Sequence, residues 1–326
     1  MTTPEQIAPR SNLRRGRASS TVELGRAAHG VLDASPHAMT LRQLYYALVS
    51  TMAIPKTEPA YGKLKRLMRL LREDGTIPWG WLVDHTRSVF APRTFAGIEG
   101  LLADSARLYR ADLMRTQPVA IQVWAESDSI GSVIARTADR YCVPTFIGRG
   151  YSARGYLWSA ARDAVAAHDA GKEVHILHVG DHDPSGEDIY RDVADTLRLY
   201  AAAVDIGWSV ASTRQLMAES GLDAIDRTAW MSFERLALTP AQIDRYDLPY
   251  RPVKSTDVRS AGFRGAGAVE VEALPVAGLL AVVDDAIRSR IDVEALRAAE
   301  LAEASERDIA RRIAATPVAD LLRGAA

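Results

Sequence analysis

The amino-acid sequence contains very little cysteine and no long apolar run. The single cysteine among 326 residues, Cys142, cannot close an intramolecular disulfide or supply a cysteine-rich zinc site, which indicates a reducing compartment. The longest apolar run, residues 273–283, is interrupted by Pro275 and is far short of the roughly 20 residues that span a bilayer. The N-terminus has arginines but lacks the apolar stretch of a secretory signal. We therefore expect a cytoplasmic protein with no membrane partner.

The composition is that of a globular protein of about two domains. Hydrophobic residues make up 48% of the chain and charged residues 25%, which excludes collagen-like, coiled-coil and wholly disordered proteins. The net charge of −1 conceals an asymmetry, because residues 1–120 carry 17 Lys and Arg against 10 Asp and Glu, whereas residues 121–326 carry 23 against 31. A basic part followed by an acidic part suggests a polyanion-binding module joined to a carboxylate-rich one, as in metal-dependent DNA enzymes. A chance division of surface charge is the alternative.

The first part of the chain contains the signals of a small helical DNA-binding module. Residues 1–37 have arginines and serines but few large apolar residues, so we expect a basic mobile arm or a loosely docked helix without a core. Thr40 is a good cap for a helix with an apolar stripe, and a second helix is predicted over residues 58–73. Residues 76–83 predict a short strand or wing, so we assign residues 38–117 to a winged helix-turn-helix domain. The apolar stripe consists of Leu41, Leu44, Tyr45, Leu48 and Met52.

Basic side chains on the second helix predict a DNA-facing surface, because this helix occupies the place of the one that such modules insert into the major groove. Contacts to phosphate would give a salt-sensitive affinity with little choice of sequence. A solvated basic face that binds nothing is the alternative. The basic residues are Lys63, Lys65, Arg66, Arg69 and Arg72.

From residue 118 onward, short apolar runs alternate with amphipathic helices, which predicts an α/β fold with a parallel-rich sheet flanked by helices. In such sheets the chemistry gathers beyond the carboxyl ends of the strands. We assign residues 118–326 to this second domain, which helices complete at its C-terminal end. The predicted strands are 119–125, 144–148, 173–179, 230–238 and 269–273, and the predicted helices are 129–141, 152–170, 186–201 and most of 274–325.

Three carboxylates follow two of these strands. Glu126 comes after the first strand, and Asp181 and Asp183 come after the third as an Asp-x-Asp pair. Because alternation makes both aspartates face one side while His182 points away, they can converge with Glu126 on one hard cation. We predict Mg²⁺, with Mn²⁺ as a substitute; strand-end acids or helix caps without a metal are the alternative. Residues 184–186 then turn into a helix whose amino end favours phosphate.

This pattern resembles the TOPRIM domain, in which a lone Glu is followed, at a distance, by Asp-x-Asp-Pro-x-Gly. TOPRIM domains occur in type IIA and IIB topoisomerases, primases and several nucleases. The resemblance therefore implies magnesium-dependent phosphodiester chemistry. The residues that carry it are Glu126, Asp181, Asp183, Pro184 and Gly186.

The preceding module narrows the resemblance. A winged helix with Arg-x-x-Tyr-Tyr directly upstream of TOPRIM is similar to the A subunit of topoisomerase VI and to its relative, the meiotic double-strand-break protein. No ATPase module is visible in the sequence, so standalone relatives of that A subunit are the expected kin. The likeness covers residues 38–190, and the segment that carries it reads Arg42, Gln43, Leu44, Tyr45, Tyr46.

Helix geometry separates the two tyrosines. At about 100° per residue, Tyr45 lies within the apolar stripe, whereas Tyr46 lies further round, one turn beyond Arg42. We expect Tyr45 to pack and Tyr46 to be able to attack; packing by both is the alternative. A guanidinium beside the phenol would favour its phenolate and hold a phosphate. The resemblance likewise implies that Tyr46 is the catalytic tyrosine.

The expected function is DNA double-strand cleavage by tyrosine transesterification, in the manner of a type IIB topoisomerase A subunit. Tyr46 would attack a phosphodiester of double-stranded DNA while magnesium stabilises the developing charge. The resemblance implies a covalent 5′-phosphotyrosyl link, a homodimer, and a separate ATPase subunit as an optional partner. The alternatives are a TOPRIM nuclease that hydrolyses DNA with metal-activated water, and a DNA-binding module that is catalytically idle. The metal ligands would be Glu126, Asp181 and Asp183.

Residues 202–326 carry fewer signals. Glu270 and Glu272 lie two apart on one predicted strand and could form a second acidic edge. Lys254 and Arg259 in the preceding loop could touch DNA. Ordinary surface roles are the alternative for all four residues.

Overall fold

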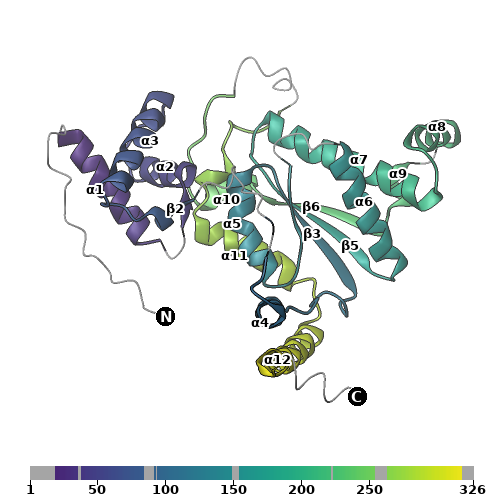
Figure 1. Ribbon diagram of the computed structural model, residues 1–326. Coiled ribbons are helices and arrows are strands. Elements are labelled where there is room, and N and C mark those ends of the chain that lie inside the picture. The colour runs from purple at the N-terminus through teal and green to yellow at the C-terminus, as the bar shows by residue number, and fades with distance from the viewer. Residues whose placement is uncertain are drawn as a thin grey trace. The chain divides into compact units, whose positions relative to one another are not determined.

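The computed structural model describes residues 19–35, 38–83, 92, 94–148, 154–221, 223–253 and 263–317. The chain divides into two compact units, Met1–Ser88 and Val89–Ala326 (Figure 1). The predicted domain boundary after residue 117 differs from this division. Helix α4 (Ile98–Leu108) packs against α12 (Val293–Ala315) and so belongs to the second unit.

The first unit is a small helical domain with one short parallel strand pair. One face of each α-helix that the structure describes in this unit contributes to a single apolar core. Strands β1 and β2 pair in parallel, with Met39 opposite Leu82. The elements are α1 (Ser19–Asp33), β1 (Met39–Thr40), α2 (Leu41–Ser50), α3 (Glu58–Glu73), the 3₁₀ helix η2 (Trp79–Trp81) and β2 (Leu82–Val83).

Both predicted helices of this unit are present and begin at the expected caps. Thr40 and Gln43 form a capping box, in which the Gln43 amide donates to the Thr40 hydroxyl at 3.2 Å and the Thr40 amide donates to the Gln43 side chain at 2.7 Å. The Thr57 hydroxyl caps α3 by accepting from the Ala60 amide at 3.4 Å. The placement of Met52 in the apolar stripe is wrong, because α2 ends before it and its side chain is 91% exposed.

Helix α1 contradicts the expectation that the first 37 residues contribute no core. Leu24, Ala28 and Leu32 recur at helical spacing and are buried against α2 and α3. This apolar stripe docks the helix on the core, even though the surrounding composition is polar. Residues 1–18 of the expected arm lie outside the described residues.

The strand predicted over residues 76–83 is shorter than expected, since only its last two residues pair as β2 and the three before them form η2. Arg72 of α3 holds this segment in place. Its Nη2 donates to the Trp79 carbonyl at 2.8 Å and to the Leu82 carbonyl at 3.1 Å, and its guanidinium lies 4.4 Å above the Trp79 ring. Arg72 is therefore a structural residue. Residues 84–91, which follow, lie outside the described residues.

The second unit is an α/β domain built on a four-stranded, all-parallel sheet in the order β4-β3-β5-β6. Helices α5 and α11 cover one face and α6 and α7 the other, and an apolar core fills each side (Figure 1). The predicted parallel-rich sheet flanked by helices is confirmed. The elements are β3 (Val119–Ala125), α5 (Asp128–Asp139), β4 (Thr145–Ile147), α6 (Arg154–Asp169), β5 (Glu173–Val179), α7 (Pro184–Ile206), α8 (Val210–Ser220), α9 (Ala224–Arg227), β6 (Met231–Ala237), α10 (Pro240–Arg245) and α11 (Val276–Arg288).

The strand order places a topological switch between β3 and β5. Helix α5 leads from β3 to β4 over one face, and α6 leads from β4 to β5 over the other, so the sheet extends from β3 in both directions. Ala125 of β3 pairs with Val179 of β5, so the two chains leave the sheet side by side. In open parallel sheets, ligands bind outside the carboxyl ends of the strands at such a switch point.

The strand predicted over residues 269–273 is wrong. Val269 makes only an isolated antiparallel bridge with His182, and residues 271–273 form the 3₁₀ helix η4. The apolar alternation in this segment has another cause, because Val269 and Val271 are buried in the core beside α5 and α11 without joining the sheet. The segment thus lies across the loop that follows β5.

Helical structure predicted for residues 274–325 is present as α11 and α12, and α12 ends at residue 315. Neither of these helices, nor any other in the part of the chain that the structure describes, combines the length and apolar character needed to cross a membrane.

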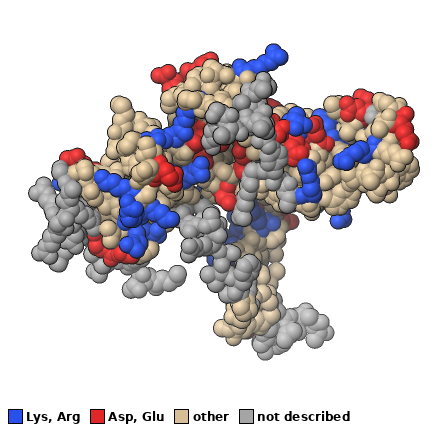
Figure 2. All heavy atoms as spheres, turned by 90° about the horizontal axis from the view of Figure 1, so that it is seen from above, with Lys and Arg blue, Asp and Glu red and all other residues tan. Residues whose placement is uncertain are grey.

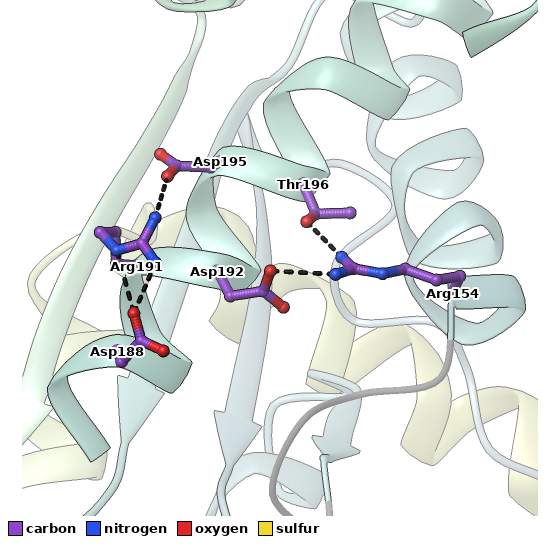
Figure 3. A network of polar contacts seen from close by, with 6 residues as sticks. All are labelled: Arg154, Asp188, Arg191, Asp192, Asp195 and Thr196. Atoms are coloured by element: carbon purple, nitrogen blue, oxygen red, sulfur yellow. Dashed lines mark hydrogen bonds and ion pairs between the residues drawn. The ribbon is translucent and has the colours of Figure 1, made fainter. Parts of the chain in front are cut away.

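Charged side chains join α6 to α7. Arg154, the first residue of α6, pairs with Asp192 at 3.1 Å and donates to the Thr196 hydroxyl at 2.6 Å, both on α7 (Figure 3). Arg191 pairs with Asp195 on its own helix at 3.1 Å. The contacts of Arg154 therefore tie α6 to α7, whose first turn follows the Asp-x-Asp pair directly.

Candidate metal centre and tyrosine site

Glu126 is the first residue after β3, and it lies against the loop that follows β5. Its amide donates to the Val179 carbonyl at 3.1 Å, and its Oε2 accepts a hydrogen bond from the Asp181 amide at 3.0 Å. Burial raises the pKa of the Glu126 carboxyl; the hydrogen bond from Asp181 opposes that rise, and the negative charge of Asp183 adds to it. The structure thus brings Glu126 into contact with the Asp-x-Asp loop.

Asp181 lies in the same cluster of charge. Its Oδ1 accepts a hydrogen bond from the Val271 amide at 2.8 Å. Burial raises the pKa of the Asp181 carboxyl well above its usual range, and the charges of Glu126 and Glu272 raise it further. An anion so unfavourably placed is one that a bound cation would stabilise.

Asp183 is the N-cap of α7. Its Oδ1 accepts a hydrogen bond from the Gly186 amide at 2.7 Å, and Pro184 begins the helix. The helix-cap role that we considered for these carboxylates is therefore present at Asp183. Its charge nevertheless raises the pKa of both Glu126 and Asp181, so it belongs to the same electrostatic cluster.

Two glycines permit the close approach of these loops. A Cβ atom added at Gly186 would lie 2.2 Å from the Asp181 carbonyl oxygen and 3.2 Å from Glu126 Oε2. A Cβ at Gly180 would lie 2.7 Å from the same Glu126 oxygen. A side chain at Gly186 would push the Asp-x-Asp loop away, so this glycine has a physical role in bringing the carboxylates together.

Glu272, expected only as part of a separate acidic edge, acts on this cluster. Its charge raises the pKa of Glu126 and of Asp181, and its Oε1 accepts a hydrogen bond from the Ser129 hydroxyl at 2.7 Å. Glu270 differs, because it pairs with Arg251 at 3.1 Å. The two glutamates therefore do not form one acidic edge. The candidate DNA contacts Lys254 and Arg259 lie outside the described residues.

Arg235, near the end of β6, brings a positive charge to the carboxylates, and our sequence analysis did not identify it. Burial lowers the pKa of its guanidinium, whereas the carboxylates of Glu187, Glu126 and Asp181 oppose that change. Its Nη2 also donates to the Asp181 carbonyl. The signal that could have identified it is an arginine near the carboxyl end of a predicted apolar strand, because a buried cation needs an anionic neighbour.

The donor chemistry of this cluster suits a hard divalent cation, since it offers carboxylate oxygens. Within the described ranges, no three His, Cys, Asp or Glu side chains are spaced to hold a metal ion as they stand. One oxygen each of Glu126, Asp181 and Asp183 instead accepts from a backbone amide. A cation that binds here would have to draw the carboxylates together and compete with these amides.

The histidines of this region have separate surroundings. His178 is only 2% exposed, and burial, together with the charge of Arg235, lowers its pKa to about 3. Its Nδ1 has no hydrogen-bond partner among the described residues, and its ring lies 5.2 Å from that of Tyr190. His178 is therefore neutral at physiological pH. His182 is also buried, and its ring lies 5.2 Å from that of Phe263.

The tyrosine pair on α2, in the first unit, has one buried and one partly exposed member. Tyr45 is 6% exposed, and its hydroxyl donates to the carbonyls of Thr57 at 3.1 Å and Pro55 at 3.4 Å. The Tyr46 ring meets the Tyr45 ring edge-on at 5.4 Å, and the Arg42 guanidinium lies 5.9 Å from the Tyr46 ring centroid. The packing role of Tyr45 is confirmed, while attack by Tyr46 stays a prediction.

Lys and Arg side chains gather on the first unit, as Figure 2 shows. Of the five cations on α3 that we predicted to face DNA, Arg72 instead donates hydrogen bonds to the carbonyls of Trp79 and Leu82. Arg69 lies 3.9 Å from Glu73 on its own helix. The remaining cations are exposed or partly exposed, and they are Lys63, Lys65, Arg66 and Arg69.

Comparison of the chain with protein-family models, with curated proteins and with solved structures found no match. Its function is therefore inferred from its own residues and their geometry.

Proposed function

We propose that this protein is a magnesium-dependent enzyme that cleaves double-stranded DNA by tyrosine transesterification, with a winged helix and a TOPRIM domain like those of a type IIB topoisomerase A subunit. The observation that carries the proposal is the contact of Glu126 with the Asp-x-Asp loop at the switch point of a parallel sheet. The position of Arg42 beside Tyr46 supports the resemblance of the Arg-x-x-Tyr-Tyr segment to the A subunit of topoisomerase VI. The exposed cations of α3 are the proposed DNA contact.

In the second unit, Glu126, Asp181 and Asp183 would hold Mg²⁺, or Mn²⁺ in its place. When bound, the ion would stabilise the negative charge that develops on the phosphoryl group and on the leaving 3′ oxygen. The raised pKa values of Glu126 and Asp181 support this role, because both carboxylates gain from a nearby positive charge. Arg235 supplies part of that charge from the protein itself.

In the first unit, the phenolic oxygen of Tyr46 would form a bond to phosphorus as the bond from phosphorus to the 3′ oxygen breaks. The phenolic proton passes to solvent, and the 3′ oxygen takes up a proton. Arg42 would hold the phosphate and favour the phenolate, which is a far better nucleophile than the phenol. The product is a 5′-phosphotyrosyl link.

Two cuts in a duplex need two subunits, so the proposal includes a homodimer. As the resemblance implies, the tyrosine of one subunit would work with the metal site of the other. A separate ATPase subunit is the proposed optional partner, and the cytoplasm is the proposed location.

The deciding experiment compares wild type with Tyr46→Phe on a labelled linear duplex and on supercoiled plasmid in the presence of Mg²⁺. After denaturation, wild-type protein should carry labelled DNA covalently. Tyr46→Phe keeps the ring but lacks the attacking oxygen, so it should bind DNA and yield neither cut nor adduct. Tyr61→Phe removes a hydroxyl from a neighbouring tyrosine, whose ring lies 5.1 Å from that of Tyr45, so it is the matched control and should behave as wild type.

The rival candidate is a TOPRIM nuclease, and one observation favours it. All the carboxylates of the cluster belong to the second unit, whereas Tyr46 belongs to the first. Hydrolysis needs only metal and water. Full cleavage by Tyr46→Phe with free DNA ends would refute the covalent mechanism in favour of the nuclease. Binding without any cleavage by wild type would leave a catalytically idle DNA-binding module.

A further inference from the structure

Two cations border the ring of Tyr46, and the sequence identified only one of them. The Lys56 ammonium lies 4.5 Å from the centroid of the Tyr46 ring, closer than the Arg42 guanidinium at 5.9 Å. Arg42 precedes Tyr46 by one turn of α2, whereas Lys56 belongs to the turn between α2 and α3. The Tyr46 ring thus lies beside two cationic side chains from two separate segments.

The position of Lys56 is set by the neighbouring tyrosine. The Tyr45 hydroxyl donates to the carbonyls of Pro55 and Thr57, the two residues that flank Lys56. The Thr57 amide donates to the Pro55 carbonyl at 2.9 Å, so the backbone on both sides of Lys56 is fixed. The Tyr45 ring itself is buried and lies 5.1 Å from the ring of Tyr61. Burial of Tyr45 therefore anchors the turn that carries Lys56.

We propose that Lys56 is a phosphate-binding residue of the tyrosine site, which contacts the phosphodiester that Tyr46 attacks, and that Tyr45 is the positioning residue that holds it there. The inference rests on the proposed function and extends it. It gives separate roles to the two tyrosines of the Tyr-Tyr pair, since one supplies the nucleophile and the other orients a cation.

Lys56 and Arg42 would act on the same atoms in different ways. Arg42 offers a planar fork for two phosphate oxygens, whereas Lys56 is a compact point charge on a flexible stem. Both charges attract the phosphodiester before the reaction and stabilise the extra negative charge of the phosphorane-like transition state. Lys56 keeps its proton throughout: the phenolic proton goes to solvent, and the 3′ oxygen takes one from solvent.

A purely structural cation–π contact is the competing account of the same geometry, and it makes different predictions. If Lys56 only packs on the ring, its loss lowers stability and leaves DNA contacts unchanged. If Lys56 binds phosphate, its loss removes one counterion-releasing contact from the DNA complex. The two accounts therefore separate in the salt dependence of DNA binding.

The first arm of the test measures affinity for a fluorescent duplex against salt, with the full chain in the Tyr46→Phe background and with EDTA, so that no cleavage occurs. Lys56→Met should lower the slope of log K against log salt by about 0.9, the value for one phosphate contact. Lys56→Arg should restore it. An unchanged slope for Lys56→Met would overturn the proposal, whatever the variant does to the melting temperature.

The second arm measures the rate of covalent adduct formation at saturating DNA with Tyr46 intact. Lys56→Met should slow the reaction by about tenfold to a hundredfold, Lys56→Arg should recover much of the rate, and Tyr45→Phe should cause a smaller loss of the same kind. A rate equal to wild type in Lys56→Met would overturn the catalytic part of the inference. If wild type forms no adduct, the proposed function fails, and the first arm alone still decides whether Lys56 binds phosphate.

Discussion

The two units place their candidate functional groups in opposite settings. In the first unit, a partly exposed phenol has cations around it, and the α3 cations lie at the surface. In the second unit, carboxylates are gathered around a largely buried guanidinium, and burial raises the pKa of Glu126 and Asp181. A surface site of cations can meet a polyanion directly, whereas partly buried carboxylates are favoured as anions only where a positive charge lies nearby.

The opposite charge of the two candidate sites follows the distribution of charged residues along the chain. Residues 1–88 carry 13 Lys and Arg against 7 Asp and Glu, and residues 89–326 carry 27 against 34. The sign asymmetry visible in the sequence is thus a property of the units themselves. We therefore expect pH and metal ions to change mainly the stability of the second unit, and salt to change mainly the binding of DNA by the first.

The largest expected effect is the response of the second unit to acid. The pKa of His178 falls to about 3 in the folded state from 6.5, so the imidazole stays neutral while the unfolded chain takes up a proton. The stability that this contributes is complete above pH 6.5 and is lost as the pH falls towards 3, by up to roughly 5 kcal/mol. His178→Gln should flatten this loss.

The measurement is the urea midpoint of wild type and His178→Gln at several pH values below 6.5. His29→Gln, in the first unit, is the matched control. An acid-induced loss of the same steepness in wild type and His178→Gln would show that the buried imidazole does not govern the response of the second unit.

Next in size is the response to magnesium. Asp181→Asn keeps the shape of the side chain and removes the charge, so it should abolish metal binding. Wild type should gain about 2.7 kcal/mol at a concentration one hundred times Kd, and the variant nothing. Asp195→Asn, on the surface of α7, is the control and should bind as wild type. Calorimetry that finds equal binding in wild type and Asp181→Asn would remove Asp181 from the site.

The same variant tests the sign of the carboxylate pKa shifts. A carboxyl whose pKa is raised by folding stabilises the protein at low pH, where it is protonated, and this stability is lost as the pH rises through the folded value. Without metal, ionisation of Asp181 should therefore reduce the stability of wild type as the pH rises above the ordinary aspartate range, in opposition to the larger gain from His178. Asp181→Asn should gain more stability than wild type over this range, and Mg²⁺ should narrow the difference by stabilising wild type alone.

Much of the second unit could be predicted from sequence, because its strands are short apolar runs with clear ends. The predicted strands 119–125 and 173–179 agree with β3 and β5 residue for residue. Their pairing then brings the residues after them together, so Glu126 and Asp181 could be placed at one edge of the sheet. Local pattern and parallel topology were enough for these positions.

What could not be predicted depends on contacts between residues far apart in the chain. The division into compact units differs from the predicted domain boundary because α4 packs on α12, and no local signal reveals that contact. Arg235 joins the carboxylates through sheet pairing beside His178, and Lys56 joins Tyr46 through the Tyr45 hydroxyl. The segment 269–273 has the alternation of a strand, but burial alone accounts for it.

A smaller effect tests the close approach at Gly186. A methyl group there would meet the Asp181 carbonyl oxygen at 2.2 Å, so Gly186→Ala should cost about 1–3 kcal/mol and weaken magnesium binding. Gly62→Ala in α3 of the first unit is the matched control, since its nearest neighbour would be Arg66 at 4.0 Å. That variant should gain up to about 1 kcal/mol, because alanine is the better helix former. Similar melting temperatures for both variants would show that the loops can separate without cost.

The smallest expected effect on folding, and the clearest one for the first unit, concerns its surface charge. Lys65 and Arg69 are exposed on α3, so replacing both with alanine should leave the fold intact and weaken binding to any duplex. Each lost phosphate contact should reduce the salt slope by about 0.9, so the double variant should lose roughly twice that. The matched control removes the same charge from the second unit, at the exposed Arg311 and Arg312 of α12. If the two double variants weaken binding equally, affinity follows net charge and α3 is not the contact surface. If only the α3 double variant has a lower salt slope, the first unit contacts the DNA phosphates through α3.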